Sequence, residues 1–271
     1  MNLSTRAIAK PLSLLFCSAL LACLAGDLSA DSPHWHQPDY IINSFLSVAM
    51  QNEHGPSDGR LHKWQVPISY QIEDRTGDQQ LHKRLVYQQF QHLSAITGLE
   101  IVPASSATGF NVRIIFSSEE QLYNELSRDL GLSNEALRKQ ISHGSVCIAR
   151  FKTNQHSAIE SAVVIIPVDR ARAHGKLLAC IVEELTQILG MPNDSTEVYP
   201  SIFNDYSFND FLTGLDYILL KLLYSPELTT GMDTDQVRQK LQTMIQKAGV
   251  AAQLLQADRL VRQQGLETLL D

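Results

Sequence analysis

Apolar and polar residues alternate from Trp64 to Ile72, and this period of two is typical of a half-buried β-strand. Pro67 lies inside the segment, which favours a place at a sheet edge or a special position within the strand, because proline has no N–H to donate. Short apolar runs bounded by polar turns predict further strands. These cover residues 99–103, 112–116, 146–151 and 162–168.

Apolar residues that recur every three or four positions predict helices between and after these strands. The predicted helices cover residues 41–50, 81–96, 122–130, 134–141, about 172–189, 208–224 and a tail over 235–270. Gly98, Gly190 and Pro226 end three of these helices, and Gly249 and Gly265 interrupt the tail. The pattern predicts an α+β fold with a mixed twisted sheet, two long helices and a helical C-terminal tail.

The first residues have the pattern of an export signal. Arg6 and Lys10 precede an apolar run over residues 12–25, which is too short to span a bilayer, where about 20 apolar residues are needed. A charged start, a short apolar core and small residues after it predict a secretory signal over residues 1–25. Alternatively, Leu20-Leu21-Ala22-Cys23 resembles a bacterial lipobox. Residues 1–22 would then be removed, and Cys23 would carry a lipid.

The remaining chain is long for one domain and short for two. Residues 26–60 are predicted to be a leader with a short helix, in which His34 and His36 flank Trp35 in a mobile polar stretch. The domain proper is predicted over 61–230, followed by the helical tail over 231–271.

Charge and cysteine content restrict the possible partners. Removal of Arg6 and Lys10 changes the formal net charge from −7 to −9, which argues against nucleic acid and anionic membrane surfaces. No later segment is apolar enough to cross a membrane, so membrane contact is expected only through a lipid anchor. Cys147 and Cys180 would tend to pair in an oxidising compartment, with two free thiols as the alternative.

The helix before Gly190 carries the candidate chemistry. Glu183, Glu184 and Gln187 lie on one face at helical spacing, and Asn193 and Asp194 follow in the turn after Gly190. The residue types alone favour an ordinary amphipathic helix with a solvated face.

The spacing resembles the zinc helix of metzincin metallopeptidases, H-E-x-x-H-x-x-G-x-x-H. Here Glu183 and Gln187 stand at the first two histidines, Glu184 at the catalytic glutamate and Asn193 at the third ligand. The order of predicted strands and helices from Trp64 to about Tyr224 is also similar to that of a metzincin domain. In this comparison, residues 162–168 correspond to an edge strand, and Phe203 of Ser201-Ile202-Phe203 stands where the methionine turn has methionine.

The chain also looks like an uncharacterised family of proteobacterial exported proteins, known as a domain of unknown function, with several putative lipoproteins. Cys147, the stretch from Cys180 to Asp194, and the segment Ser201-Ile202-Phe203-Asn204-Asp205 carry this resemblance, together with Leu212-Thr213, Asp216 and Leu223-Tyr224. The resemblance implies export and supports an anchor at Cys23, but it implies no reaction.

A standard zinc site is not expected, because zinc favours imidazole and thiolate ligands and both ligand histidines are absent. Oxygen ligands suit calcium or magnesium better, so a hard cation is possible at the set Glu183, Glu184, Asn193, Asp194 and Asp205. The favoured alternative is a buried hydrogen-bond network of Glu183 and Gln187 with the Asn193 turn. No histidine is singled out by spacing; His143, His156 and His174 are nearest in sequence.

The sequence therefore predicts a peptidase-like domain that is not catalytic and that binds a peptide or an envelope partner. The alternative is a hydrolase in which Glu184 acts as general base with an unusual metal or none. A third possibility is a purely structural envelope protein. The identity of the substrate or partner is open.

Overall fold

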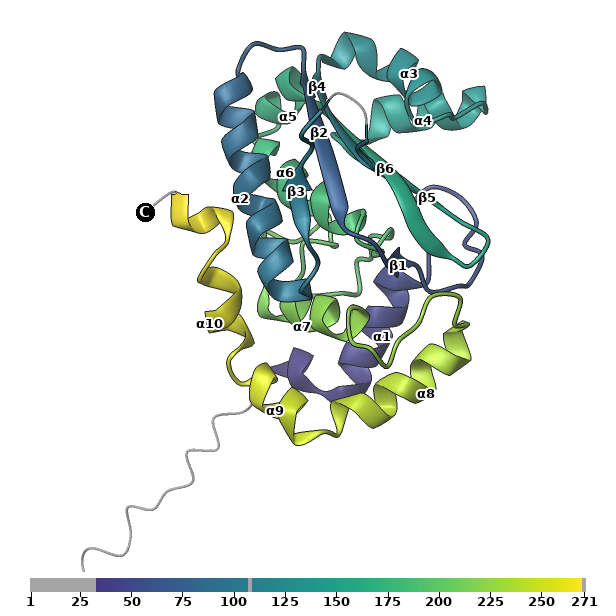
Figure 1. Cartoon of the computed structure of the whole chain (residues 1–271), viewed down its shortest axis with the longest axis vertical. Helices are drawn as coiled ribbons and strands as arrows, with labels where there is room; N and C mark the ends of the chain where they lie inside the picture. The colour runs from purple at the N-terminus through teal and green to yellow at the C-terminus, as the bar shows by residue number, and fades with distance from the viewer. Residues whose placement is uncertain (1–32, 107–108, 270–271) are drawn as a thin grey trace, which may run out of the picture. The chain divides into compact units, whose positions relative to one another are not determined.

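Parallel strand pairing organises the domain. The computed structural model describes residues 33–106 and 109–269, so the predicted signal segment and Cys23 lie outside the described residues. The strands are β1 (Lys63–Trp64), β2 (Ile68–Asp74), β3 (Ile101–Pro103), β4 (Val112–Ser117), β5 (Ile148–Thr153) and β6 (Ala158–Pro167). One compact unit begins at His34 (Figure 1).

The sheet is mixed, as predicted. Strands β3, β2, β4 and β6 are parallel neighbours in that order, and β1 runs parallel to the start of β6. Strand β5 pairs antiparallel with β6. The interpretation of residues 162–168 as an edge strand is wrong, because β6 lies between β4 and β5. Pro67 falls in the break between β1 and β2, where its missing N–H costs no ladder bond.

Helices cover both faces of the sheet (Figure 1). They are η1 (His34–His36), α1 (Pro38–Ala49), α2 (Gln79–Thr97), α3 (Glu119–Arg128), α4 (Glu135–Gly144), α5 (Val168–Ala173), α6 (Leu177–Gln187), α7 (Gly214–Leu223), α8 (Thr234–Ile245), α9 (Ala248–Leu254), α10 (Ala257–Arg262) and η2 (Leu266–Leu269). Within residues 33–106 and 109–269, no helix is both long enough and apolar enough to cross a bilayer.

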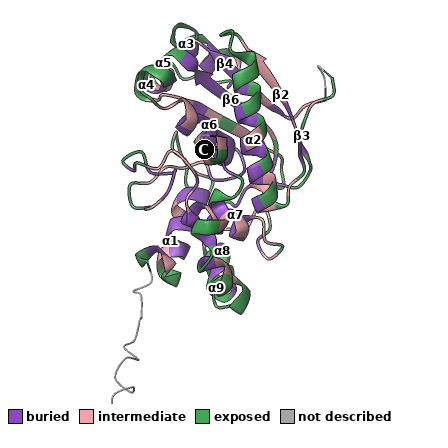
Figure 2. Ribbon diagram, turned by 90° about the vertical axis from the view of Figure 1, so that its left-hand side faces the viewer, coloured by how far each residue is buried: buried purple, intermediate pink, exposed green. Residues whose placement is uncertain are grey.

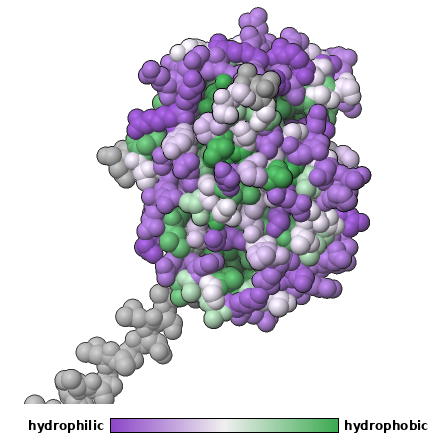
Figure 3. Space-filling model, viewed as in Figure 1, coloured by the Kyte–Doolittle hydropathy of each residue, from purple (hydrophilic) through white to green (hydrophobic). Residues whose placement is uncertain are grey.

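Alternate residues of the central strands face two separate cores. Ile114 and Phe116 of β4 join the large core beneath α2, α6 and α7, whereas Ile115 joins a smaller core beneath α3 and α4. Helix α2 covers the large core, so it buries one side and exposes the other (Figure 2). On the face viewed in Figure 3, only small apolar patches interrupt a mostly hydrophilic surface.

The two predicted long helices are both shorter than their apolar patterns. The segment 172–189 is divided between α5 and α6, because Gly175 has a φ of +68° that no right-handed helix can contain. The segment 208–224 is helical only from Gly214, because Thr213 and Asp216 form a capping box that fixes the first turn of α7 there. Phe208 is 99% exposed, so it does not belong to the buried face of a helix.

Both flanking segments pack against the domain. Trp35 of η1 is buried in the large core, so the prediction of a mobile stretch is wrong around this residue. The tail contributes Val237, Leu241 and Val261 to the same core. Its first predicted break, at Gly249, lies inside α9, and the chain instead leaves the helix between α8 and α9. The division into segments at residues 60 and 230 stays a prediction.

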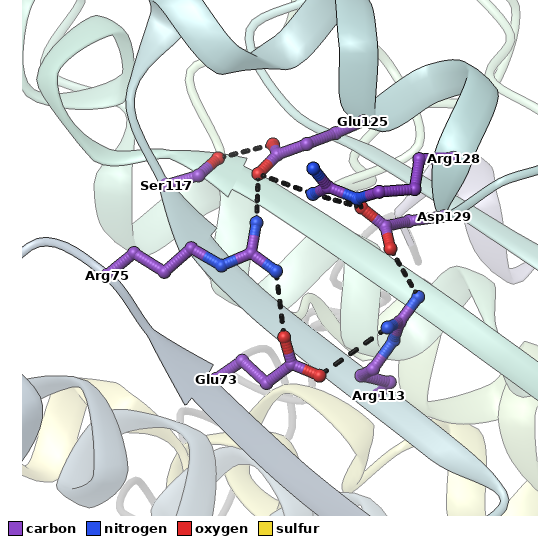
Figure 4. Close-up of polar contacts among 7 residues, drawn as sticks. All are labelled: Glu73, Arg75, Arg113, Ser117, Glu125, Arg128 and Asp129. Atoms are coloured by element: carbon purple, nitrogen blue, oxygen red, sulfur yellow. Dashed lines mark hydrogen bonds and ion pairs between the residues drawn. The ribbon is translucent and has the colours of Figure 1, made fainter.

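An ion-pair network ties α3 to the sheet (Figure 4). Glu125 of α3 is fully buried and accepts hydrogen bonds from Arg75 and from Ser117 Oγ, the latter at 2.7 Å. The network continues through Glu73, Arg113, Asp129 and Arg128. Burial of the Glu125 carboxylate costs free energy, and the groups that pair with it offset this cost. These pairs exist only while Glu125 carries its negative charge, so the network depends on Glu125.

Glu125→Gln should lower the free energy of unfolding by about 2–4 kcal/mol, because Arg75 and Arg128 lose the buried, charged acceptor of their guanidinium groups. Urea unfolding measures this change. The matched control is Glu120→Gln on the exposed side of α3, for which we expect a change within about 0.5 kcal/mol. Equal effects of the two substitutions would contradict the structural role of the network.

Candidate functional site: an acidic cleft beside helix α6

Helix α6 presents its polar face to a cleft of about 340 Å³. The opposite face is held in the core by Ile181, Val182 and Leu185, which are fully buried. The apolar periodicity therefore orients the helix so that Glu183 and Glu184 both line the cleft.

The predicted disulfide is confirmed and lies in the wall of this cleft. Cys147, just before β5, is bonded to Cys180 of α6. The bond closes a long loop and fixes the start of β5 against α6. Because Cys180 lies one helical turn before Glu183 and Glu184, the bond also positions the acidic face.

The turn after α6 is anchored by two aromatic side chains. Trp64 Nε1 donates to the carbonyl oxygen of Ile188 at 2.8 Å, and Tyr224 Oη donates to that of Leu189 at 2.7 Å. Gly190 then has a φ of +114°, which a residue with a Cβ rarely adopts. This geometry returns the chain toward α6.

The returning chain brings Asp194 back to α6. Gln187 Nε2 donates to Asp194 Oδ1 at 3.0 Å. Asn193 instead donates from Nδ2 to the carbonyl oxygen of Ser47 in α1, also at 3.0 Å. The structure thus brings Gln187 and Asp194 together beside Glu183 and Glu184, and it places the amide of Asn193 against α1.

Asp205 reaches the cleft on a second tight turn. Ser201 Oγ donates to Asp216 Oδ1 at 2.6 Å, and the Ile202 amide donates to Asp216 Oδ2 at 3.2 Å. Burial raises the pKa of Asp216 to about 6 despite these hydrogen bonds. Phe203 is fully buried, and Asn204 Nδ2 donates to the carbonyl oxygen of Val198 at 3.0 Å. The next residue, Asp205, is thereby held at the rim.

Three carboxyl groups from distant segments converge here. One oxygen from each of Glu183, Asp194 and Asp205 lies within 4.8 Å of the other two. Glu53, in the segment after α1, lines the same cleft. No local pattern indicates a role for Glu53, because this residue lies in a polar stretch without periodicity and reaches the site only through tertiary packing.

Burial and mutual repulsion favour the protonated form of four of these carboxyls, those of Glu53, Glu183, Glu184 and Asp194. Desolvation raises the pKa of Glu183 and Glu184 well above the ordinary value, and the nearby acids add to the rise. The same causes raise the pKa of Asp194 to about 6 and that of Glu53 to about 8. Such clustered shifts are typical of functional sites, although buried structural networks also produce them.

Glu184 is buried in the cleft with an incomplete set of hydrogen bonds. It is only 4% exposed, and its Oε2 has no hydrogen-bond partner among the described residues. An orphaned buried carboxyl oxygen is costly, so it indicates a missing partner such as water, an ion or a ligand group.

The three histidines near this region in sequence are placed differently. His174 lines the cleft. His143 is on exposed α4, and His156 lies in the exposed turn between β5 and β6. Within the part of the chain that the structure describes, the only cluster of potential metal ligands consists of carboxylates.

These features define a disulfide-linked mixed α/β domain with an acidic cleft at its central helix. The chain belongs to the family described as protein of unknown function (DUF2927), whose profile matches residues 38–243. The expectation of an uncharacterised family is confirmed. No curated protein and no solved structure is significantly similar to this chain.

Proposed function

We propose that this protein is an exported, non-catalytic domain of metzincin-like arrangement that binds an extended peptide segment of an envelope partner. The observation that carries the proposal is the free edge of β5 beside the cleft. Strand β5 pairs with β6 on one side, and no described strand pairs with its other side. An extended peptide can add to such an edge through main-chain hydrogen bonds.

A second hollow of about 420 Å³ follows β5 and supports this mode of binding. Ala149, Phe151 and Ile188 line it, and Glu53 borders both this hollow and the acidic cleft. A peptide along β5 would therefore place one side chain against an apolar wall and the next against carboxylates. This arrangement favours peptides that carry lysine or arginine.

The ligand positions support a role without zinc catalysis. Gln187 and Asn193 stand where the zinc-binding histidines would be, and both amide nitrogens already donate to protein oxygens. Their remaining amide oxygens are neutral and are weak ligands for zinc. Zinc-activated water is therefore not available to Glu184 by the usual route.

Exposed aromatic residues near the cleft support a macromolecular partner. Tyr206 and Phe208 flank the cleft-lining residue Ser207 and are 83% and 99% exposed. Large exposed aromatics are costly in water and commonly become the anchors of an interface.

The test uses two pools of fluorescent extended peptides, one with a fixed central arginine and one with a fixed central aspartate. We expect anisotropy to show tighter binding of the arginine pool. Tyr206→Ser/Phe208→Ser should weaken that binding about tenfold. Leu255→Ser removes an equally exposed apolar side chain near the C-terminal helices and should leave binding unchanged.

Binding of neither pool would overturn the proposal. The same incubations, followed by mass spectrometry, test the hydrolase alternative, which the unpartnered oxygen of Glu184 favours. Peptide cleavage that disappears in Glu184→Gln with the fold intact would replace the binding function with a catalytic one.

A further inference from the structure

The acidic cluster lacks a described counter-charge. No arginine or lysine among the described residues forms an ion pair with Glu183, Asp194 or Asp205. Lys176 lines the cleft, but its ammonium is bound to Asp210 Oδ1 at 2.7 Å. Concentrated negative charge in a partly buried cleft is unfavourable unless protons or a cation neutralise it.

A second observation points to a ligand at the same place. Glu184 is more than nine-tenths buried, lines the same cleft, and leaves Oε2 without a hydrogen-bond partner among the described residues. The neighbouring carboxyl groups form no hydrogen bond with this oxygen. A positive ion in the cleft would supply the missing partner.

We propose that Glu183, Asp194 and Asp205 bind a hard divalent cation of the Ca²⁺ type, with Glu184 as a further carboxylate beside it. Carboxylate oxygens are the preferred ligands of such ions, at about 2.3–2.6 Å from Ca²⁺. Opposite ligands of one Ca²⁺ shell are then about 4.6–5.2 Å apart. The three separations in this cluster are all within 4.8 Å, so none exceeds the upper end of that span.

The surroundings favour calcium over magnesium and zinc. Mg²⁺ requires oxygens at about 2.0–2.1 Å in near-octahedral geometry, which three carboxylates from three separate segments supply less easily. Zinc lacks imidazole and thiolate ligands in this cluster. Gln187 does not complete the shell but donates to Asp194, which orients that carboxylate.

The cation would connect three segments that the chain brings together only by folding. Glu183 is on α6, Asp194 follows the Gly190 turn, and Asp205 follows the Ser201 turn. Binding to the folded state alone stabilises that state by mass action. Cation binding is measured without any peptide, so this inference does not depend on the proposed peptide binding.

Calorimetric titration of the chelator-treated protein with CaCl₂, MgCl₂ and ZnCl₂ tests the inference, beside thermal unfolding with each salt. We expect one Ca²⁺ per chain, a rise in Tm with Ca²⁺, and affinity for Mg²⁺ lower by about tenfold or more. Failure of both Ca²⁺ and Mg²⁺ to bind at about 10 mM would overturn the inference, as would stoichiometric binding of zinc alone.

Two variants locate the site. Asp205→Asn changes an exposed residue, so the fold should persist, and we expect Ca²⁺ affinity to fall about tenfold or more. Glu120→Gln removes an exposed carboxylate on α3 that does not line the cleft and should leave Ca²⁺ affinity unchanged. Equal affinities of the wild-type protein and Asp205→Asn would show that Ca²⁺ binds elsewhere and would overturn the assignment.

Discussion

Raising the pH from about 6.5 to about 8.5 should destabilise the cation-free protein by about 3 kcal/mol for each cluster carboxyl that keeps its proton in the folded state. In this window the carboxyls of the unfolded chain are ionised, whereas burial and repulsion raise the folded-state pKa of Glu183 and Glu184 well above 4.5. The folded state therefore binds more protons than the unfolded state. The free energy of unfolding therefore falls as the pH rises toward the raised pKa of the folded state.

Other groups have a lowered pKa, and the histidine and aspartates among them change the stability of the fold only below pH 6.5. Burial lowers the pKa of His92 to about 4, so its contribution grows only up to the unfolded value of about 6.5. The lowered pKa of Asp74 and Asp129 matters below pH 4. The interval above pH 6.5 consequently reports mainly on the acidic cluster, beside Lys63, whose pKa burial lowers from 10.5.

Urea unfolding at pH 6.5, 7.5 and 8.5, in the presence of a chelator, measures the slope. Glu183→Gln should flatten it, because a neutral amide carries no titratable proton, whereas Glu120→Gln on α3 should not. Added Ca²⁺ should also flatten the slope, since the cation replaces the protons. Stability that is constant or rises over this interval would contradict the proposed protonation of the cluster.

Gly190→Ala should lower the free energy of unfolding by about 4 kcal/mol or more, a large fraction of the roughly 5–15 kcal/mol of an ordinary domain. A Cβ at this position would lie 2.1 Å from the backbone oxygen of His62, which precedes β1. The backbone must also keep a φ of +114°. Neither side of the contact can yield easily, because Trp64 and Tyr224 hold the turn by hydrogen bonds.

Gly175→Ala is the matched control for the backbone conformation. Gly175 also has a positive φ, but no atom lies within 4 Å of an added Cβ. We expect a loss of about 1 kcal/mol there, from conformational strain alone. Thermal and urea unfolding compare the two variants, and similar losses would show that the approach to His62 is not the limiting contact.

Local patterns were sufficient where each element is determined by its own residues. The alternation around Ile68 to Ile72 predicted β2, and the periodicity of residues 81–96, with Gly98 in the left-handed conformation, predicted α2 and its end. Cys147 and Cys180 were predicted to pair without knowledge of the path between them. The stripe of Glu183, Glu184 and Gln187 was visible because helical spacing is a local property.

Helix boundaries needed more than hydrophobic pattern. The apolar residues on either side of Gly175 are buried in two helices rather than one, and the capping box of Thr213 and Asp216 starts α7 at Gly214 rather than at Phe208. Periodicity records which residues are buried. It does not record where a positive φ or a capping box interrupts the backbone.

The sequence by itself determined most of the strands and helices and the acidic face of α6, because these depend on spacing along the chain. Only the tertiary structure decided that β5 rather than β6 is the edge strand, since pairing joins residues far apart in sequence. It also decided that Glu53 and Asp205 join Glu183 and Asp194. The charge of a cluster, and hence its affinity for protons or cations, depends on distance and burial in space, which no local pattern contains.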